Sequence, residues 1–343
     1  LIGDPGGKDS ERPMQTEQTI SFNVHKAEEQ LNRIFSGHDF KLVNNLDWTK
    51  DLKVIDFLRN IGKHFSMTPL VQRDYIAKRI GEDGAGISYS EFSYTLLQGM
   101  DYLHLYDEFG VTLQLGGSDQ WGNCLSGVEL VRKARGAEAH VITLPLIMNK
   151  ATGKKFGKSE EGAVWLDPER TSPTQFYQFW INTDDEGAEG YLKIFTDLGK
   201  REIDEIVARH RENPKERFAQ TRLAQEVTRL VHSEEEMKAA EAVTLCLTGK
   251  KPIGEADARV LNIMRRELLY AKAHAGDELI EVLAAAGLAG SKGEARRLLT
   301  DNAIAINNEK TNKERLDEAD FQNGRLLLRK GRAFKDSALV EEA

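Results

Sequence analysis

Two hydrophobic periods alternate along the first 150 residues or so. Apolar side chains recur at helical spacing over 27–35, 54–61 and 68–80, which predicts amphipathic helices. Short apolar runs bounded by glycine or charge lie at 40–43, 111–115 and 140–144, and they predict strands. Strands that alternate with helices favour an α/β fold with a Rossmann-like, doubly wound parallel sheet.

The pattern changes beyond this region. Residues 151–170 are dominated by Lys, Gly, Ser and Glu, which predicts a mobile loop, whereas 173–241 has helical periodicity almost throughout. The last segment predicts helices at 279–286 and 293–300 and strands at 303–306 and 325–329. We therefore expect an α/β domain at 1–172, an α-helical domain at 173–250, a linker at 251–276 and a small α+β domain at 277–343.

Composition narrows the function classes. The net charge of −8 argues against non-specific nucleic-acid binding and a DNA partner, but it leaves room for local basic clusters that contact RNA. Cys124 and Cys246 are the only cysteines and lack neighbours at metal spacing, so we expect no disulfide framework and no metal site. No run approaches the ~20 apolar residues of a membrane helix. Together these features predict a cytoplasmic protein without a membrane partner.

The beginning of the chain carries the first candidate site. A glycine-rich turn, Gly3-Asp4-Pro5-Gly6-Gly7-Lys8, is followed by Arg12. Backbone N–H groups of such a turn can hold phosphates, with the cations beside them. The turn departs from the Walker A pattern at both ends, and a plain surface turn would give the same sequence. The chain also starts without Met, at what resembles the end of a strand, so we expect an upstream segment.

A polar stripe forms the second candidate. Tyr94, Gln98 and Asp101 have the spacing i, i+4, i+7, which places a phenol, an amide and a carboxylate on one helix face. These groups could hold a small polar ligand by directed hydrogen bonds. A solvated helix surface is the plainer interpretation of the same stripe.

The third candidate follows the predicted strand at 111–115. The segment Gln114 to Asn123 contains Gly116, Gly117, Asp119 and Gln120. Ligands bind beyond the carboxyl ends of parallel strands, glycines let a ligand approach the backbone, and a carboxylate can bind ribose hydroxyls. The alternative is an ordinary strand–helix turn in which Ser118 or Asp119 caps the helix.

The fourth candidate is the run Lys155-Phe156-Gly157-Lys158-Ser159. Two lysines on a flexible loop suit the stabilisation of phosphoryl charge, although spacing alone favours a basic turn.

Taken together, these four segments resemble the class I aminoacyl-tRNA synthetases, and specifically the tyrosyl-tRNA synthetase family. Residues 155–159 are similar to its K-F-G-K-S form of the K-M-S-K-S signature, and 116–123 to its G-G-S-D-Q-W-G-N segment. Tyr94, Gln98 and Asp101 match its tyrosine-binding helix, and 44–48 and 57–63 also resemble the family. The upstream H-I-G-H signature is absent from these residues.

The resemblance implies a tyrosine–tRNA ligase that uses ATP with Mg²⁺, L-tyrosine and tRNA(Tyr), and that forms a homodimer through about 44–93. It implies that Asp4, Tyr94 and Gln98 hold the tyrosine ammonium, Asp101 the phenol and Gln120 the carboxylate side. Gln114, Gly117 and Asp119 would line the tyrosine or the ribose, Leu146 and Ile147 would flank the adenine, and Lys8, Arg12, Lys155 and Lys158 would meet the phosphates.

The resemblance extends to the end of the chain. Residues 173–250 resemble the family's anticodon-recognition domain, and 277–343 resemble the small RNA-binding domain of ribosomal protein S-four. The implied RNA contacts are Lys292, Arg296, Arg297, Arg329 and Lys330, with Arg332 and Lys335 nearby. Two other interpretations stay open: a truncated or non-catalytic synthetase-like RNA-binding protein, and the sister tryptophanyl enzyme, against which Asp101 argues because an indole has no hydroxyl.

Overall fold

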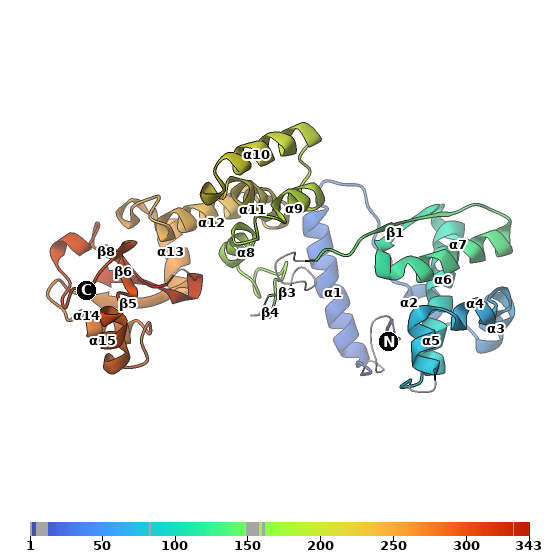
Figure 1. Ribbon diagram of the computed structural model, residues 1–343. Coiled ribbons are helices and arrows are strands. Elements are labelled where there is room, and N and C mark those ends of the chain that lie inside the picture. Colours follow the sequence, from blue (N-terminus) through green and yellow to red (C-terminus); the bar gives the residue numbers. More distant parts are fainter. Residues whose placement is uncertain (1, 5–12, 82–83, 149–157, 160–161, 332) are drawn as a thin grey trace. The chain divides into compact units, whose positions relative to one another are not determined.

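A computed structural model describes residues 2–4, 13–81, 84–148, 158–159, 162–331 and 333–343 (Figure 1). The chain divides into two units, 1–148 and 149–343, which we describe separately. The first unit contains α1 (Glu17–Ile34), α2 (Leu46–Thr49), α3 (Val54–Asn60), α4 (Met67–Val71), α5 (Asp74–Ile80), α6 (Tyr89–Phe109), β1 (Leu113–Gly117), α7 (Trp121–Arg135) and β2 (His140–Leu144), with 3₁₀ turns at Gly62–His64 and Ser118–Gln120.

Strand β1, helix α7 and strand β2 form a parallel βαβ unit. Leu113 pairs with His140 and Gly117 with Leu144, so both strands end at the same edge. This confirms the α/β expectation, and it places the segment after β1 beyond the carboxyl end of a parallel pair, where ligands bind in such sheets.

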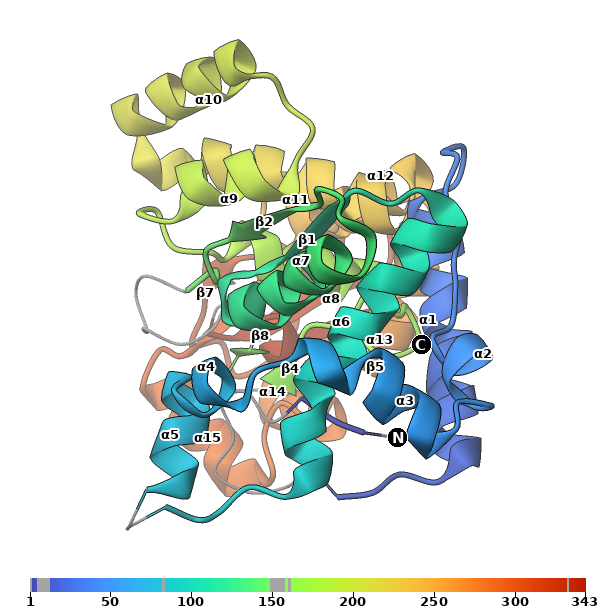
Figure 2. The ribbon, with the colours of Figure 1, turned by 90° about the vertical axis from the view of Figure 1, so that its right-hand side faces the viewer.

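Helix α6 has clear sequence signals at both ends. Ser88 and Glu91 form a capping box at its start, and Gly110 ends it in the left-handed conformation that favours glycine. Its neighbour α7 lies alongside it (Figure 2). The two helices approach closely at Gly127, where an added Cβ would lie 2.6 Å from the Tyr102 ring. This contact sets the distance between the two helices that carry most of the candidate site.

Three expectations for the first unit need correction. Residues 40–43 form no strand; Phe40, Leu42 and Val43 are partly exposed in an extended segment. The helix expected at 27–35 begins ten residues earlier, at Glu17, where Thr16 caps it. The helix expected at 68–80 is split into α4 and α5, because Arg73 has an extended backbone. Short apolar runs and local periodicity do not resolve such breaks.

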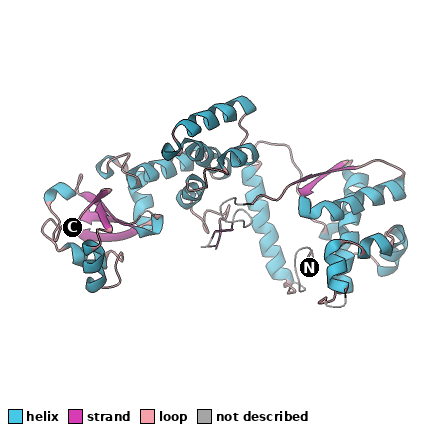
Figure 3. Cartoon of the chain, in the orientation of Figure 1, coloured by secondary structure: helices cyan, strands magenta, loops and turns pink. Residues whose placement is uncertain are grey.

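The second unit has a short two-stranded ladder, then a run of helices, and then a five-stranded sheet with its own helices (Figure 3). Its elements are β3 (Lys158–Ser159), β4 (Gly162–Ala163), α8 (Pro173–Ile181), α9 (Ala188–Phe195), α10 (Lys200–Glu212), α11 (Phe218–Val231), α12 (Glu234–Leu247), α13 (Ala258–Glu267), β5 (Leu269–Ala273), α14 (Leu279–Ala285), α15 (Lys292–Thr300), β6 (Ile304–Ile306), β7 (Glu309–Lys310), β8 (Arg325–Lys330) and β9 (Ser337–Glu342). Short 3₁₀ turns lie at Pro214–Glu216, Ile253–Glu255, Glu318–Asp320 and Phe334–Asp336.

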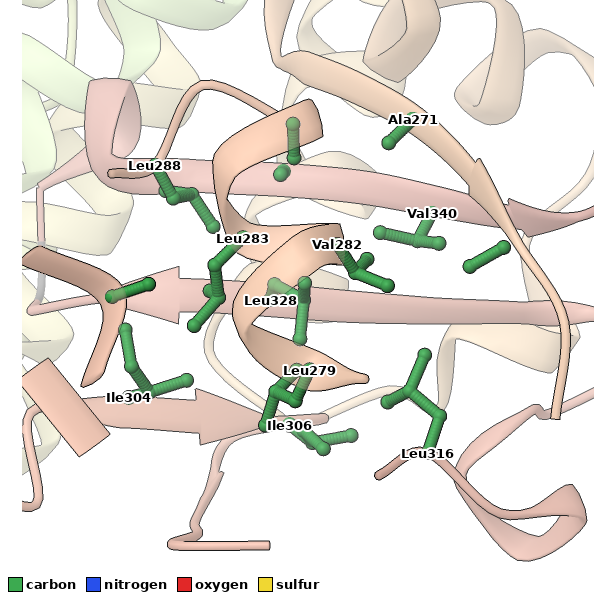
Figure 4. Close-up of a cluster of buried hydrophobic side chains, with 14 of the residues drawn as sticks. Ala271, Leu279, Val282, Leu283, Leu288, Ile304, Ile306, Leu316, Leu328 and Val340 are labelled. Carbon is green, nitrogen blue, oxygen red and sulfur yellow. The ribbon is translucent and has the colours of Figure 1, made fainter. Parts of the chain in front are cut away.

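The C-terminal sheet has the order β5-β9-β8-β6-β7 and is covered on both faces. Leu326, Leu328 and Val340 pack with α14 and α15 in one core (Figure 4). Leu327 and Leu339 point the other way and pack with residues of α12 and α13. The alternation of strand side chains therefore joins the small domain to the helical one.

The expected linker at 251–276 contains regular structure. Helix α13 lies inside it, and β5 pairs in parallel with β9 as an edge strand of the C-terminal sheet. The exact domain boundaries remain a prediction. Within the described residues, no helix has the length and apolar character to cross a membrane.

Candidate active site

Asp101 is held by two donors from one short segment. The Asn45 side chain donates its Nδ2–H to Asp101 Oδ2 at 3.0 Å, and the Trp48 indole donates Nε1–H to Asp101 Oδ1 at 2.8 Å. The ring of His104, one turn further along α6, stacks on Trp48 with centroids 4.2 Å apart. The carboxylate is therefore fixed in position, and it retains lone pairs that can accept a further O–H bond.

Asp101 also lines a cavity of about 340 Å³. Asn45 and Trp48 share its wall, and the rest of the lining is largely apolar, including Val24, Ala27 and Leu105. An acceptor on an otherwise apolar wall suits a ligand that has an aromatic body and a hydroxyl tip.

A second group of predicted residues meets beyond the carboxyl end of β1. Gln120 donates Nε2–H to Asp4 Oδ2 at 2.7 Å, and it accepts a hydrogen bond from Asn123 Nδ2 at 3.3 Å. Asp4 and Gln120 are 116 positions apart in sequence, so their contact is a tertiary result. A carboxylate beside an amide offers both an acceptor and a donor to a zwitterionic ligand.

Three residues expected near ATP lie together. A Cβ added at Gly117 would be 2.7 Å from Asp119 Oδ1 and 3.3 Å from Leu146 Cδ2. A side chain at position 117 would therefore displace the Asp119 carboxylate and contact Leu146. Ile147 is half-buried directly after Leu146.

The remaining predicted tyrosine ligands are Gln98, Gln114 and Tyr94. Gln98 donates Nε2–H to Cys124 Sγ at 3.8 Å, and burial raises the pKa of this thiol, which therefore stays neutral. Gln114 Oε1 is buried without a hydrogen-bond partner among the described residues. Tyr94 is half-buried on the same helix as Gln98.

Three of the four predicted phosphate contacts lie outside the described residues, and only the main chain of the fourth is described. Lys8, Arg12 and Lys155 lie outside the described residues. The main chain of Lys158 is described and pairs with Ala163 in a short antiparallel ladder.

The C-terminal basic residues have partners of their own. Lys292 pairs with Glu281, and Lys330 with Glu294, and both pairs are partly exposed. Hydrogen bonds from the Gly290 backbone and from Lys330 lower the pKa of Glu294. Arg296 lines a surface hollow of about 650 Å³ together with Thr300 and Arg315.

Arg329 differs from the other basic residues in what it contacts. Its Nη1 donates to the backbone oxygen of Leu247, at the end of α12, and to Asn308 Oδ1. Asn308 in turn donates to the Cys246 oxygen at 3.3 Å. Arg329 and Asn308 thus bond carbonyls that lack intrahelical partners at a helix C-terminus.

Arg73 is a further residue near the site, and no sequence motif marks it. This residue lies in the break between α4 and α5 and donates to Thr95 on α6 and Ser126 on α7. No local sequence pattern distinguishes Arg73 from arginines that would be expected at the surface. Asn45 and Trp48 lie in a segment that resembles the family. Their positions in the sequence, however, do not predict that they contact Asp101.

Comparisons with known proteins identify the family. The model of class I tRNA synthetases for tryptophan and tyrosine matches residues 1–248, and the model of a tyrosine–tRNA ligase C-terminal domain matches 268–334. Tyrosine–tRNA ligase 2 of Bacillus cereus is 40% identical, and the match covers 99% of this chain and 81% of the relative. The chain belongs to the tyrosyl-tRNA synthetase family.

Other members agree with this assignment. The tyrosine–tRNA ligase of Bacteroides fragilis is 43% identical over 90% of this chain and 75% of its own length. The crystal structure of a C-terminally truncated mitochondrial tyrosyl-tRNA synthetase from Coccidioides posadasii matches with a TM-score of 0.59 and 29% identity, covering 70% of each chain. The family consists of ligases, so the chain is an enzyme of the class I synthetase fold, and the tryptophanyl interpretation is wrong.

Proposed function

We propose that this chain activates L-tyrosine with ATP and transfers it to the 3′ end of tRNA(Tyr). The tyrosine carboxylate would attack the α-phosphate, giving tyrosyl-adenylate and pyrophosphate, and a terminal ribose hydroxyl would then attack the adenylate carbonyl. Such steps depend on positioning and charge stabilisation more than on a protein nucleophile. One observation carries the proposal. Asp101 is oriented at the wall of a cavity, and Asp4 bonds Gln120 beyond the end of β1, so the structure offers polar groups for both ends of a tyrosine.

Asp101 would select tyrosine. Its carboxylate, oriented by Asn45 and Trp48, would accept the phenol hydroxyl. Phenylalanine would leave that carboxylate desolvated without a new bond, which costs free energy that tyrosine does not lose.

The amino-acid end would be bound by the second group. Asp4, Tyr94 and Gln98 would meet the ammonium, and Gln120 would meet the carboxylate side. The hydrogen bond between Asp4 and Gln120 supports these roles, because it places a carboxylate oxygen and an amide nitrogen side by side. Gln114 would take part through its buried oxygen.

The nucleotide would lie along Gly117, Asp119, Leu146 and Ile147. The close approach of Asp119 and Leu146 to Gly117 supports a shared ribose and adenine site. Lys8, Arg12, Lys155 and Lys158 would neutralise the phosphates. Mg²⁺ would be held mainly by the phosphates of ATP, because this ion usually keeps water and substrate phosphates as its ligands.

Lys292, Arg296, Arg297, Arg329 and Lys330 would contact tRNA phosphates. Exposed ion pairs such as Lys292–Glu281 exchange partners at little cost, which suits a polyanion. Arg329 would first have to leave its backbone carbonyl.

A homodimer would form through the region 44–93. Helix α3 and the start of α4 support this, because Val54, Ile55 and Met67 are 71%, 72% and 58% exposed. Such apolar exposure is typical of an interaction surface. We also place the enzyme in the cytoplasm, where buried free thiols such as Cys124 and Cys246 stay reduced.

Tyrosine-dependent exchange of pyrophosphate into ATP tests the first step, with phenylalanine and tryptophan as controls. Exchange with tyrosine alone, followed by charging of tRNA(Tyr), is the expected result. Equal exchange with tryptophan would contradict the role of Asp101. The absence of tyrosine-dependent exchange would contradict the proposed activation step.

A further inference from the structure

We propose that Arg73, Thr95 and Asn123 form a positioning relay that orients the amide of Gln120 toward the carboxylate of the amino acid. None of the three would touch the substrate. The inference rests on the proposed function, because it assumes that Gln120 and Asp4 bind the amino-acid end.

The relay is a continuous chain of hydrogen bonds between side chains from five places in the sequence. Arg73 Nη1 donates to Thr95 Oγ1 at 3.0 Å, and Thr95 Oγ1 donates to Asn123 Oδ1 at 2.8 Å. Asn123 Nδ2 donates to Gln120 Oε1 at 3.3 Å, and Gln120 Nε2 donates to Asp4 Oδ2 at 2.7 Å.

Arg73 sets the direction of this chain. A guanidinium has donors only, so Thr95 Oγ1 accepts from Arg73, and the Thr95 hydroxyl donates to Asn123 Oδ1. Asn123 then presents its oxygen to Thr95 and its NH₂ group to Gln120. Gln120 must accept with its oxygen, which turns its NH₂ group toward Asp4. One hydrogen of that group bonds Asp4, and the other can be donated to a substrate carboxylate.

The surroundings make the direction costly to reverse. Thr95 and Asn123 are 1% and 4% exposed, so neither can exchange its partners for water at low cost. Arg73 is held from a second side, because its Nη2 donates to Ser126 Oγ at 2.7 Å. Ser126 is itself bonded to the Gly122 oxygen. The cation at the start of the relay is therefore anchored to both α6 and α7.

A plain alternative is that these buried polar groups only satisfy one another and stabilise the contact between α6 and α7. The two interpretations differ in what a broken link does. A structural network would affect folding, or all ligands equally. A relay would affect only ligands that have a carboxylate for Gln120 to bind.

The experiment is pyrophosphate exchange with Thr95→Val, which keeps the shape of the side chain and removes the hydroxyl. We expect KM for tyrosine to rise about three- to tenfold, the effect of one lost hydrogen bond, with kcat changed less. The Ki of tyramine, which has the phenol and the ammonium but no carboxylate, should stay within about twofold. Thr95→Ser, which restores the hydroxyl, should recover the tyrosine KM.

Ser93→Ala is the matched control. Ser93 is a buried hydroxyl on the same helix, bonded to the Ser90 oxygen and outside the relay, so tyrosine KM and tyramine Ki should both stay at the wild-type values. Asn123→Asp, which is nearly isosteric and removes the donor to Gln120, repeats the test if Thr95→Val fails to fold.

The inference is overturned if folded Thr95→Val or Asn123→Asp binds tyrosine as the wild type does, or if tyrosine and tyramine weaken equally. Wild-type protein that shows no tyrosine-dependent exchange would instead overturn the proposed function, and the inference with it.

Discussion

The two candidate binding regions hold their polar groups in opposite ways. Near α6 and α7, buried side chains form one directed chain from Arg73 to Asp4, in which Thr95 is 1% exposed. In the C-terminal domain, Lys292 and Lys330 lie in partly exposed pairs with single carboxylates. Buried hydrogen bonds hold the side chains around a small ligand in one geometry. Exposed ion pairs are weak, so their lysines can exchange a carboxylate for a phosphate of the nucleic-acid backbone.

The largest effect should come from the buried ion pair that supports α6. Arg79 and Glu91 form two hydrogen bonds, at 2.7 and 2.9 Å, and are 7% and 5% exposed. The Arg79 side chain lowers the pKa of Glu91 despite its burial. Glu91→Ala leaves the guanidinium buried without its partner, and we expect a loss of about 3–5 kcal/mol in the unfolding free energy of the first unit.

Amide hydrogen exchange in α6 would measure this loss. The control is Glu129→Ala, which breaks the exposed Arg132–Glu129 pair and should cost less than about 1 kcal/mol. Equal losses for the two variants would remove the distinction between buried and exposed pairs. The double change Arg79→Met with Glu91→Leu should recover most of the stability.

The next effect concerns tyrosine activation. Asp101→Asn keeps the shape of the side chain but removes the charged acceptor for the phenol. We expect kcat/KM for tyrosine to fall about 10- to 150-fold, which corresponds to one hydrogen bond to a charged group. Asp107→Asn on the same helix, where Asp107 bonds Arg135, is the control and should leave exchange unchanged. Unchanged tyrosine kinetics in Asp101→Asn would remove Asp101 from the site.

The next prediction concerns Arg329, which bonds the backbone at the end of α12 and is also a proposed contact of tRNA. Arg329→Met removes the bonds to the Leu247 oxygen and to Asn308. We expect the second unit to lose about 1–3 kcal/mol of unfolding free energy, because buried carbonyls at the end of α12 lose a donor. The slope of log affinity for tRNA against log salt should also fall by about one, because Arg329 is one of the proposed phosphate contacts. A loss of stability with an unchanged salt slope would leave Arg329 with only its role at the end of α12.

The smallest effects should come from the partly exposed lysines. Lys292→Gln or Lys330→Gln should change stability by less than about 0.5 kcal/mol. Each should weaken tRNA binding at all salt concentrations and reduce the slope of log affinity against log salt by about one. Lys313, which pairs with Asp317 and Asp320, is the control outside the set. An equal effect of Lys313→Gln would show that the basic residues act only through net charge.

Much of the site could be predicted from the sequence. The strand predicted at 111–115 and found at Leu113–Gly117, the helix face with Gln98 and Asp101, and the turn at Gly117 and Asp119 all follow from local periodicity or from family-like segments. The helix expected at 68–80 failed because Arg73 breaks it, and Arg73 is held by contacts with α6 and α7 rather than by its neighbours in sequence.

By itself, the sequence determined most of the helices and strands, the polar face of α6 and the family, because helical period, caps and motifs are local properties of the chain. The tertiary structure alone decided which groups meet. Asn45 and Trp48 reach Asp101 across 56 and 53 positions, and Arg329 caps α12 across 82. Such contacts depend on how helices and strands pack, because the spacing of two residues along the chain does not fix the distance between them in the folded protein when they belong to different elements.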